Sequence, residues 1–133
     1  MSTKLIHVSG KRKRAIARAT LRPGRGIIRI NKVPIELYQP KIARMKLQEP
    51  LILAGGTAKK VDIDINVIGG GQTSQAEAAR LTIGKALARY DKKLTEVFLN
   101  YDRQLLVADV RRKETHKPNR HGKARAKVQK SYR

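Results

Sequence analysis

Residues 61–90, which read VDIDINVIGGGQTSQAEAARLTIGKALARY, carry the pattern that decides the fold. The first seven of them alternate strictly, with aliphatic side chains at odd positions and polar ones, including Asp62 and Asp64, at even positions. A period of two residues is typical of a strand with one buried and one solvated face. Because the alternation stops at Gly69-Gly70-Gly71, the sequence predicts a strand that ends in a glycine turn.

A long helix is predicted directly after these glycines. Ser74 and Glu77 have the spacing of a capping box, in which each side chain bonds to the backbone of the other residue. Small or aliphatic residues then recur every three to four positions, as on the buried side of a helix. These residues are Ala76, Ala79, Ile83, Leu87 and Tyr90. We therefore expect this helix to begin at Ser74 and to pack on a sheet.

The first forty residues indicate more strands. Residues 4–8 (KLIHV) are a strand candidate, and residues 15–21 alternate with small or aliphatic side chains at odd positions. Arg22-Pro23-Gly24, followed by Gly26, supplies the dihedral angles of a turn. We expect residues 27–30 to form a strand that completes a hairpin with residues 15–21, and residues 31–40 to be a connector.

The rest of the body is predicted to be helical. Residues 41–53 have a loose helical spacing that we expect to break at Pro50 and to end at Gly55-Gly56. Residues 94–101 predict a second short helix, and residues 105–110 a last apolar segment. After Arg111 only Val128 is a larger aliphatic residue. We therefore divide the chain into a compact body, residues 1–110, and an extended basic C-terminal tail, residues 111–133.

The positive charge is concentrated at both ends. The 133 residues include 31 Lys and Arg against 10 Asp and Glu, a formal net charge of +21. Residues 1–30 contribute +9 without any acid, residues 111–133 contribute another +9, and the middle is nearly neutral at +3. A short basic run such as residues 11–14 can be a solvated face or a nuclear-import signal, but such surfaces usually mix both signs. The segregation indicates a polyanionic partner.

Several classes of protein are disfavoured by composition. The chain has no Cys, which excludes disulfides, zinc knuckles and thiol nucleophiles and favours a reducing compartment. We see neither an apolar run near the roughly 18 residues of a membrane span nor a secretory signal, so we expect a soluble, intracellular protein. An apolar content of 40% in 133 residues supports one domain.

Two motifs could carry chemistry. The glycines at 69–71 could cradle a phosphate, form a tight turn, or lie against an RNA backbone; a P-loop is absent because Ala79 and Ala86 stand at required Gly and Ser/Thr positions. Asp62 and Asp64 share a strand face, as a catalytic pair would, although a solvated face explains them as well.

The histidines His7, His116 and His121 have no carboxylate or cysteine at ligand spacing. We therefore expect no enzyme, metal, cofactor or small-molecule substrate. Aromatic residues make up 4% of the chain, too few for the stacking platforms of single-strand readers. The sequence favours contacts to the phosphate backbones of structured RNA or DNA.

Three separated segments resemble one family. They are SGKRKRAIAR at 9–18, the glycine turn with QAEAARL at 75–81, and the ending AKVQKSYR at 126–133. Together they resemble the ribosomal protein S-nine family, the universal ninth protein of the small ribosomal subunit. The KSYR ending is similar to the archaeal and eukaryotic branch, whereas bacterial members typically end in SKR.

The resemblance implies a two-layer α/β (α+β) fold with a mainly antiparallel sheet packed with helices and a left-handed crossover, as in the second domain of ribosomal protein S-five. It implies a cytoplasmic, structural role in the head of the small subunit, among neighbouring head proteins. The tail would reach peptidyl-site tRNA, where Arg133 contacts the backbone of the anticodon stem-loop. Tyr132 stands where bacterial members have a lysine.

These considerations give two sets of expected contacts. The resemblance implies that tRNA is bound by Lys130, Tyr132 and Arg133. Ribosomal RNA is expected at Lys11, Arg12, Lys13, Arg14, Arg18, Gly69, Gly70, Gly71, Arg111, Arg112, Lys113, Lys117, Arg120, Lys123, Arg125, Lys127 and Gln129. Composition alone also permits an architectural nucleic-acid protein such as a chromatin compactor, and an enzyme that acts on RNA through Asp62 and Asp64 is a third alternative.

Overall fold

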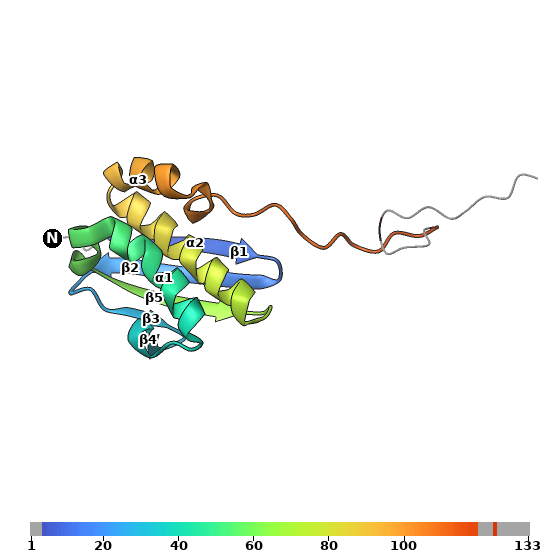
Figure 1. Cartoon of the computed structure of the whole chain (residues 1–133), viewed down its shortest axis with the longest axis horizontal. Helices are drawn as coiled ribbons and strands as arrows, with labels where there is room; N and C mark the ends of the chain where they lie inside the picture. Colours follow the sequence, from blue (N-terminus) through green and yellow to red (C-terminus); the bar gives the residue numbers. More distant parts are fainter. Residues whose placement is uncertain (1–3, 120–123, 125–133) are drawn as a thin grey trace, which may run out of the picture.

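A five-stranded sheet and three α-helices make up the body of the computed structural model, which describes residues 4–119 and residue 124 (Figure 1). The elements follow one another as β1 (Ile6–Arg12), β2 (Ala15–Pro23), β3 (Ile28–Ile30), β4 (Val33–Pro34), η1 (Ile35–Leu37), α1 (Lys41–Ala54), η2 (Gly55–Lys60), β5 (Val61–Ile68), α2 (Gln72–Tyr90), α3 (Lys93–Tyr101) and η3 (Arg103–Leu105).

The sheet has the strand order β1-β2-β5-β3-β4. All neighbours are antiparallel except β3 and β5, which run parallel and are linked through α1. In Figure 1 the helices lie in front of the sheet, β5 runs to the right, and the chain moves up from β3 to β5, which makes this crossover left-handed. The predicted fold class, a mainly antiparallel sheet under helices, is confirmed.

The helices cover one face of the sheet, and the core lies between the two layers. The odd residues from Val61 to Val67 are buried, as the alternation predicted, and so are Ala15, Ala17, Ala19 and Leu21 of β2. Phe98 of α3 and Leu105 of η3 are fully buried as well. None of the helices in the described part of the chain combines the length and apolar character that a membrane span needs.

The predicted hairpin between residues 15–21 and 27–30 is wrong. β5 lies between β2 and β3, and the loop that joins those two strands is held by Asp62 of β5 instead. Instead, β2 forms a hairpin with β1, with Arg12 opposite Ala15 across a two-residue turn, and β3 forms one with β4. The sequence pattern hid the first hairpin because β1 extends into the basic run.

Three local predictions also need correction. α2 begins at Gln72 with Gly71 as its N-cap, without a side-chain cap, so Ser74 lies inside the first turns and forms no capping box. α1 continues through Pro50, whose burial against the core compensates for the backbone hydrogen bond that proline cannot donate. The expected connector at residues 31–40 contains β4 and η1.

The backbone groups at the two edges of the sheet are arranged differently. Along β1, the backbone carbonyls of Ser9 and His7 accept hydrogen bonds from Lys85 Nζ (3.1 Å) and Arg89 Nη1 (3.0 Å) of α2. At the opposite edge, β4 is only two residues long and contains Pro34, which has no backbone N–H.

Candidate nucleic-acid interface

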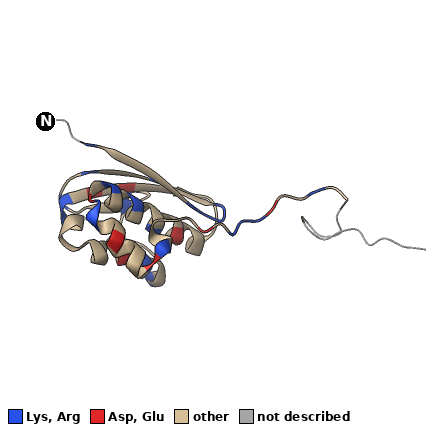
Figure 2. Ribbon diagram, turned by 90° about the horizontal axis from the view of Figure 1, so that it is seen from above, with Lys and Arg blue, Asp and Glu red and all other residues tan. Residues whose placement is uncertain are grey.

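The turn of the β1–β2 hairpin projects basic side chains from one end of the sheet. Lys11, Lys13 and Arg14 are exposed there, and Lys13 has a φ of 54°, in the left-handed region. Figure 2 shows Lys and Arg at this turn and along the segment that leaves the body after η3, whereas Asp and Glu lie mainly among the helices. The hairpin therefore presents several cations on a short, well-defined turn.

The glycine turn lies directly against this hairpin. Gly69 and Gly70 have φ values of 75° and 66°, which favour glycine. A Cβ at Gly69 would lie 2.7 Å from the carbonyl oxygen of Arg14, and one at Gly70 would lie 3.0 Å from Ala15. These glycines thus allow the strand-to-helix turn to pack on the backbone of the basic hairpin, whereas Gly71 is exposed with open space around its Cα.

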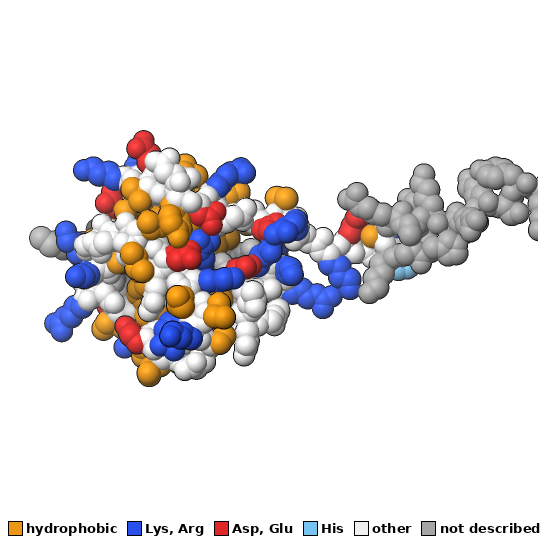
Figure 3. Space-filling model, in the orientation of Figure 1, with side chains coloured by type: hydrophobic (Ala, Val, Ile, Leu, Met, Phe, Trp, Pro, Cys, Tyr) orange, Lys and Arg blue, Asp and Glu red, His pale blue; other side chains and the backbone are white. Residues whose placement is uncertain are grey.

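A groove of about 1090 Å³ lies between three segments that are distant in sequence. They are the hairpin turn, the glycine turn with the start of α2, and the first residues after the body. The lining residues are Lys13, Arg14, Gly70, Gly71, Ser74, Arg111, Arg112, Lys113, Glu114, Thr115 and His116. Five of these are Lys or Arg, and the one acid, Glu114, is bonded to Lys117 Nζ at 2.5 Å. Figure 3 shows cationic side chains gathered where this segment leaves the body.

The first turn of α2 adds to the positive potential of the groove. Gly71 and Ser74 line it, and the N-terminus of this 19-residue helix has no side-chain cap. The first amides of a helix and the positive end of its dipole both favour an anion. The groove thus combines exposed cationic side chains with backbone N–H donors, which suits phosphate groups.

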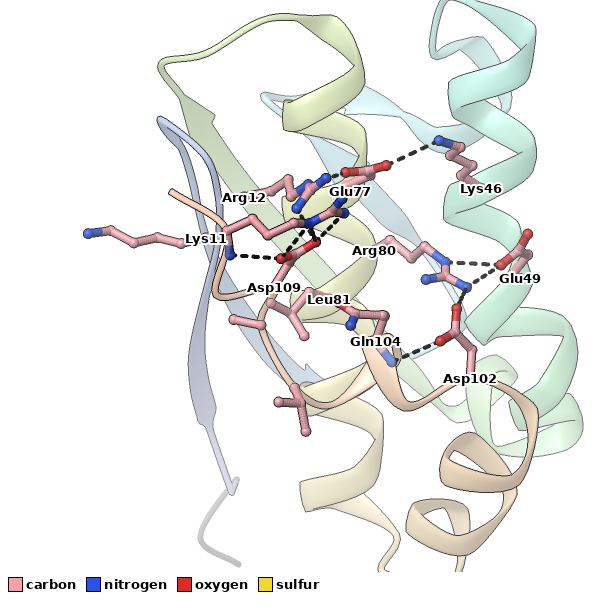
Figure 4. A pocket seen from close by; sticks show the side chains of 13 residues that line it. Lys11, Arg12, Lys46, Glu49, Glu77, Arg80, Leu81, Asp102, Gln104 and Asp109 are labelled. Carbon is pink, nitrogen blue, oxygen red and sulfur yellow. Dashed lines mark hydrogen bonds and ion pairs between the residues drawn. The ribbon is translucent and has the colours of Figure 1, made fainter. Parts of the chain in front are cut away.

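Arg12 is set apart from the other cations of the hairpin. Its side chain is only 15% exposed; its Nε donates to Glu77 Oε2 at 2.6 Å, and its Nη1 is paired with Asp109 (Figure 4). Glu77 also pairs with Lys46 Nζ at 3.3 Å. Burial raises the pKa of Glu77, but the hydrogen bonds from Arg12 and Lys46 outweigh this and leave its pKa below the ordinary value.

Comparison with known proteins identifies the family. A family model described as ribosomal protein S9/S16 matches residues 10–133. The chain belongs to the ribosomal protein S9/S16 family. It is 55% identical over 133 residues to a protein named small ribosomal subunit protein uS9 from Methanococcus maripaludis, an alignment that covers 98% of this chain and 99% of that protein. A protein of the same name from Methanococcus vannielii is 54% identical over 133 residues, and that alignment also covers 98% of this chain and 99% of the relative. The resemblance seen in the sequence is confirmed.

The ribosomal protein S9/S16 family consists of structural, non-enzymatic components, which confirms that the chain is not an enzyme. The two strand carboxylates accordingly have structural partners. Asp62 accepts hydrogen bonds from the amides of Arg25, Gly26 and Ile27, and Asp64 lies 3.4 Å from Arg22 Nη2. Chiefly the amides of Ile27 and Arg25 hold the pKa of Asp62 below its ordinary value.

The two histidines in the described part of this S9-family chain, His7 and His116, have other surroundings than a metal cluster. His7 Nδ1 lies 3.1 Å from Thr20 Oγ1, and His116 lines the groove. Within residues 4–119 and residue 124, no group of three or more His, Asp or Glu is arranged to hold a metal ion. His121 lies outside the described residues.

The remaining predicted RNA contacts are distributed unevenly. Arg18 is exposed on the open face of the sheet, opposite Asn66 of β5, and not in the groove. Lys117 is exposed next to Glu114. The following predicted contacts lie outside the described residues: Arg120, Lys123, Arg125, Lys127, Gln129, Lys130, Tyr132 and Arg133.

Two acidic residues next to the groove were missed by sequence reasoning. Asp109 and Glu77 were not singled out as partners of the basic block, because nothing local links them to Arg12. Asp109 did offer one signal, since it is the last acid before the run Arg111-Arg112-Lys113. An isolated acid at the start of a basic segment is a candidate for an intramolecular ion pair.

Proposed function

We propose that this S9-family protein binds the ribosomal RNA of the small-subunit head through the groove, and that its C-terminal residues contact peptidyl-site tRNA. Family membership makes the chain a structural constituent of the small ribosomal subunit, in the cytoplasm, with ribosomal RNA and other ribosomal proteins as its neighbours. The proposal adds which surfaces of the chain make the contacts.

One observation carries the RNA part of the proposal: the groove joins three separate segments into one cationic surface. Its five basic residues are exposed, and its one acid is paired with Lys117. Phosphate contacts of this kind position a protein on folded RNA without reading bases. The shortage of aromatic residues supports the same mode of binding.

The proposed contacts fall into two groups. The phosphate-binding side chains of the groove are Lys13, Arg14, Arg111, Arg112 and Lys113, with Lys11 beside them and Gly71 at the helix end. Gly69 and Gly70 contribute by allowing the close packing of the two turns. Arg18 would contact RNA on the other face of the sheet, independently of the groove.

The tail part of the proposal rests on the sequence. Residues 111–133 carry ten basic residues and one acid. Fully extended, a segment of this length spans about 75 Å, so its end can act far from the body. We propose that the tail cations hold ribosomal RNA and that Lys130, Tyr132 and Arg133 contact the tRNA backbone.

The groove is tested by reversing its charge. Lys13→Glu with Arg14→Glu should weaken binding to a transcript of the small-subunit head RNA and reduce the slope of log affinity against log salt by about two units. The fold should remain intact, because exposed charge changes usually cost less than about 0.5 kcal/mol.

The matched control makes the same charge change at the other end of the sheet. Lys59→Glu with Lys60→Glu alters two exposed residues of η2, which lies opposite the hairpin turn in Figure 1. If both double variants lose the same affinity, net charge and not the groove determines RNA binding.

A further inference from the structure

We propose that Arg12 is a positioning residue and not an RNA contact: with Asp109 it fastens the start of the C-terminal segment to the body, and this fastening assembles the groove. The effect on RNA rests on the proposed function, whereas the fastening itself does not.

The geometry of Arg12 favours an internal role. The Arg12 side chain is 15% exposed. Its guanidinium lies between two carboxylates, that of Glu77 in α2 and that of Asp109 in the segment that follows η3 (Figure 4). Its Nη1 is buried and makes no hydrogen bond within the described residues, so the ion pair with Asp109 is what compensates its burial there. A phosphate in contact with this guanidinium would also face both carboxylates, which would repel it.

Asp109 connects two sides of the structure. Its side chain is 14% exposed, and besides Arg12 it accepts hydrogen bonds from Arg111, at 2.9 Å from the backbone amide and 2.6 Å from Nη2. The bond to Arg111 lies within the segment and cannot hold it to the body. Among the hydrogen bonds and ion pairs of the described residues, the pair Arg12–Asp109 is the one that joins this segment to β1.

A second attachment point fixes the path of the chain before Asp109. Leu105 is fully buried, and its carbonyl oxygen would lie 2.4 Å from a Cβ at Gly84, so η3 rests directly on the backbone of α2. Held at Leu105 and again at Asp109, the chain is directed past the hairpin, which places Arg111, Arg112 and Lys113 opposite Lys13 and Arg14. Loss of the Arg12–Asp109 pair removes the attachment at Asp109 and leaves the one at Leu105 in place.

The fastening can be tested in the full-length protein without RNA. Because the chain has no Cys, nitroxide labels at Lys59→Cys and Val110→Cys, both at exposed positions, report one intramolecular distance. We expect a narrow distance distribution in the parent protein and a distribution at least twice as broad after Arg12→Gln or Asp109→Asn. An equally narrow distribution in both variants would overturn the proposal.

Two further variants serve as controls. Arg111→Gln removes the 77% exposed side chain that binds Asp109 from within the segment, and Glu49→Gln removes a carboxylate from the separate pair with Arg80. Both should leave the distribution narrow. If Arg111→Gln broadens it as much as Arg12→Gln does, the segment is ordered by its own contacts and the proposal fails.

RNA binding to head-RNA transcript gives an independent measurement. Asp109→Asn removes a negative charge, so simple electrostatics predicts tighter binding, whereas loss of the fastening predicts binding about threefold to tenfold weaker because the groove is no longer preorganised. Tighter binding would contradict the assembly of the groove by this pair. If Lys13→Glu with Arg14→Glu leaves the affinity for the RNA transcript unchanged, the proposed RNA-binding surface is wrong. The distance distribution between the two labels still tests, independently of RNA, whether Arg12 and Asp109 hold the segment to the body.

Discussion

Asp62 holds a loop by accepting hydrogen bonds from three consecutive amides, those of Arg25, Gly26 and Ile27, at 2.8 to 3.1 Å. These bonds fix the chain between β2 and β3, which are separated in the sheet by β5 itself. A single carboxylate therefore secures the connection that allows β5 to lie in the middle of the sheet.

We predict that Asp62→Ala lowers the free energy of unfolding by about 1 kcal/mol at pH 7, less than the roughly 1.5–3 kcal/mol of a hydrogen bond to a charged group, because solvent screens a carboxylate near the surface. The pKa of Asp62 is lowered in the folded state, so its contribution is present above the ordinary carboxyl pKa and is lost as the pH falls through the lower folded value. Urea unfolding of parent and variant should therefore converge at acidic pH.

Asp64→Ala is the matched control, because Asp64 shares the strand face but has only a 3.4 Å pair with Arg22 and is 48% exposed. Its effect at pH 7 should be smaller than that of Asp62→Ala. Equal losses of unfolding free energy would show that the hydrogen bonds from the three backbone amides to Asp62 add no stability beyond that of an ordinary surface carboxylate.

Single residues differ in how far the sequence predicts them. The buried positions of β5 follow from alternation alone, because strand geometry places every second side chain on one face. The pairing of Arg12 with Asp109 could not be predicted, because it depends on where the chain returns after α3. Arg12 was therefore grouped with its sequence neighbours, although Lys11 and Lys13 are exposed and it is not.

At the scale of elements, the contact between α2 and η3 depends on a glycine. By helix propensity alone, Gly84→Ala should stabilise the helix by about 1 kcal/mol. The added Cβ, however, would lie 2.4 Å from the backbone of Leu105, which cannot be relieved by a side-chain rotation. We predict a net loss of about 1–3 kcal/mol in unfolding free energy, as in other overpacked sites.

Gly56→Ala provides the comparison for this substitution, because its Cβ would meet nothing within 4 Å. It should leave the unfolding free energy nearly unchanged or slightly raise it. If Gly84→Ala, like Gly56→Ala, left the unfolding free energy from a urea titration unchanged, η3 would not pack directly on α2 in solution.

Helices show where local signals fail. The Ser74–Glu77 motif predicted a capping box, but Glu77 is engaged by Arg12 and Lys46 and the helix begins earlier, at Gln72. Pro50 predicted a break, but the packing of α1 on the core overrides it. In both cases a tertiary contact outweighs a preference that is correct for an isolated segment.

At the scale of the whole molecule, fold class and family could be predicted, whereas strand order could not. The placement of β5 between β2 and β3 brings together residues such as Thr20 and Asp64 that no local pattern pairs. The groove itself was not predicted. Its cations and glycines were named as separate RNA contacts, but their convergence depends on the sheet and on the path after η3.

The tail is tested with assembled small subunits. We predict that deleting Arg133 leaves subunit yield nearly unchanged and raises the dissociation rate of peptidyl-site tRNA by less than the tenfold to hundredfold that one charge-assisted phosphate contact of about 1.5–3 kcal/mol could give. Deleting residues 127–133 should raise it further and lower the yield. Unchanged tRNA dissociation from correctly assembled subunits that lack residues 127–133 would limit the tail to anchoring RNA.

The structure of the two edge strands, β1 and β4, has a consequence for the protein in its free state. An open edge strand can recruit a strand of another molecule and begin aggregation. Here the outer carbonyls of β1 at His7 and Ser9 already bind Arg89 and Lys85, whose charges also repel a second copy, and β4 offers two residues with a proline. We therefore expect the free protein to resist aggregation by strand addition at either edge of its sheet.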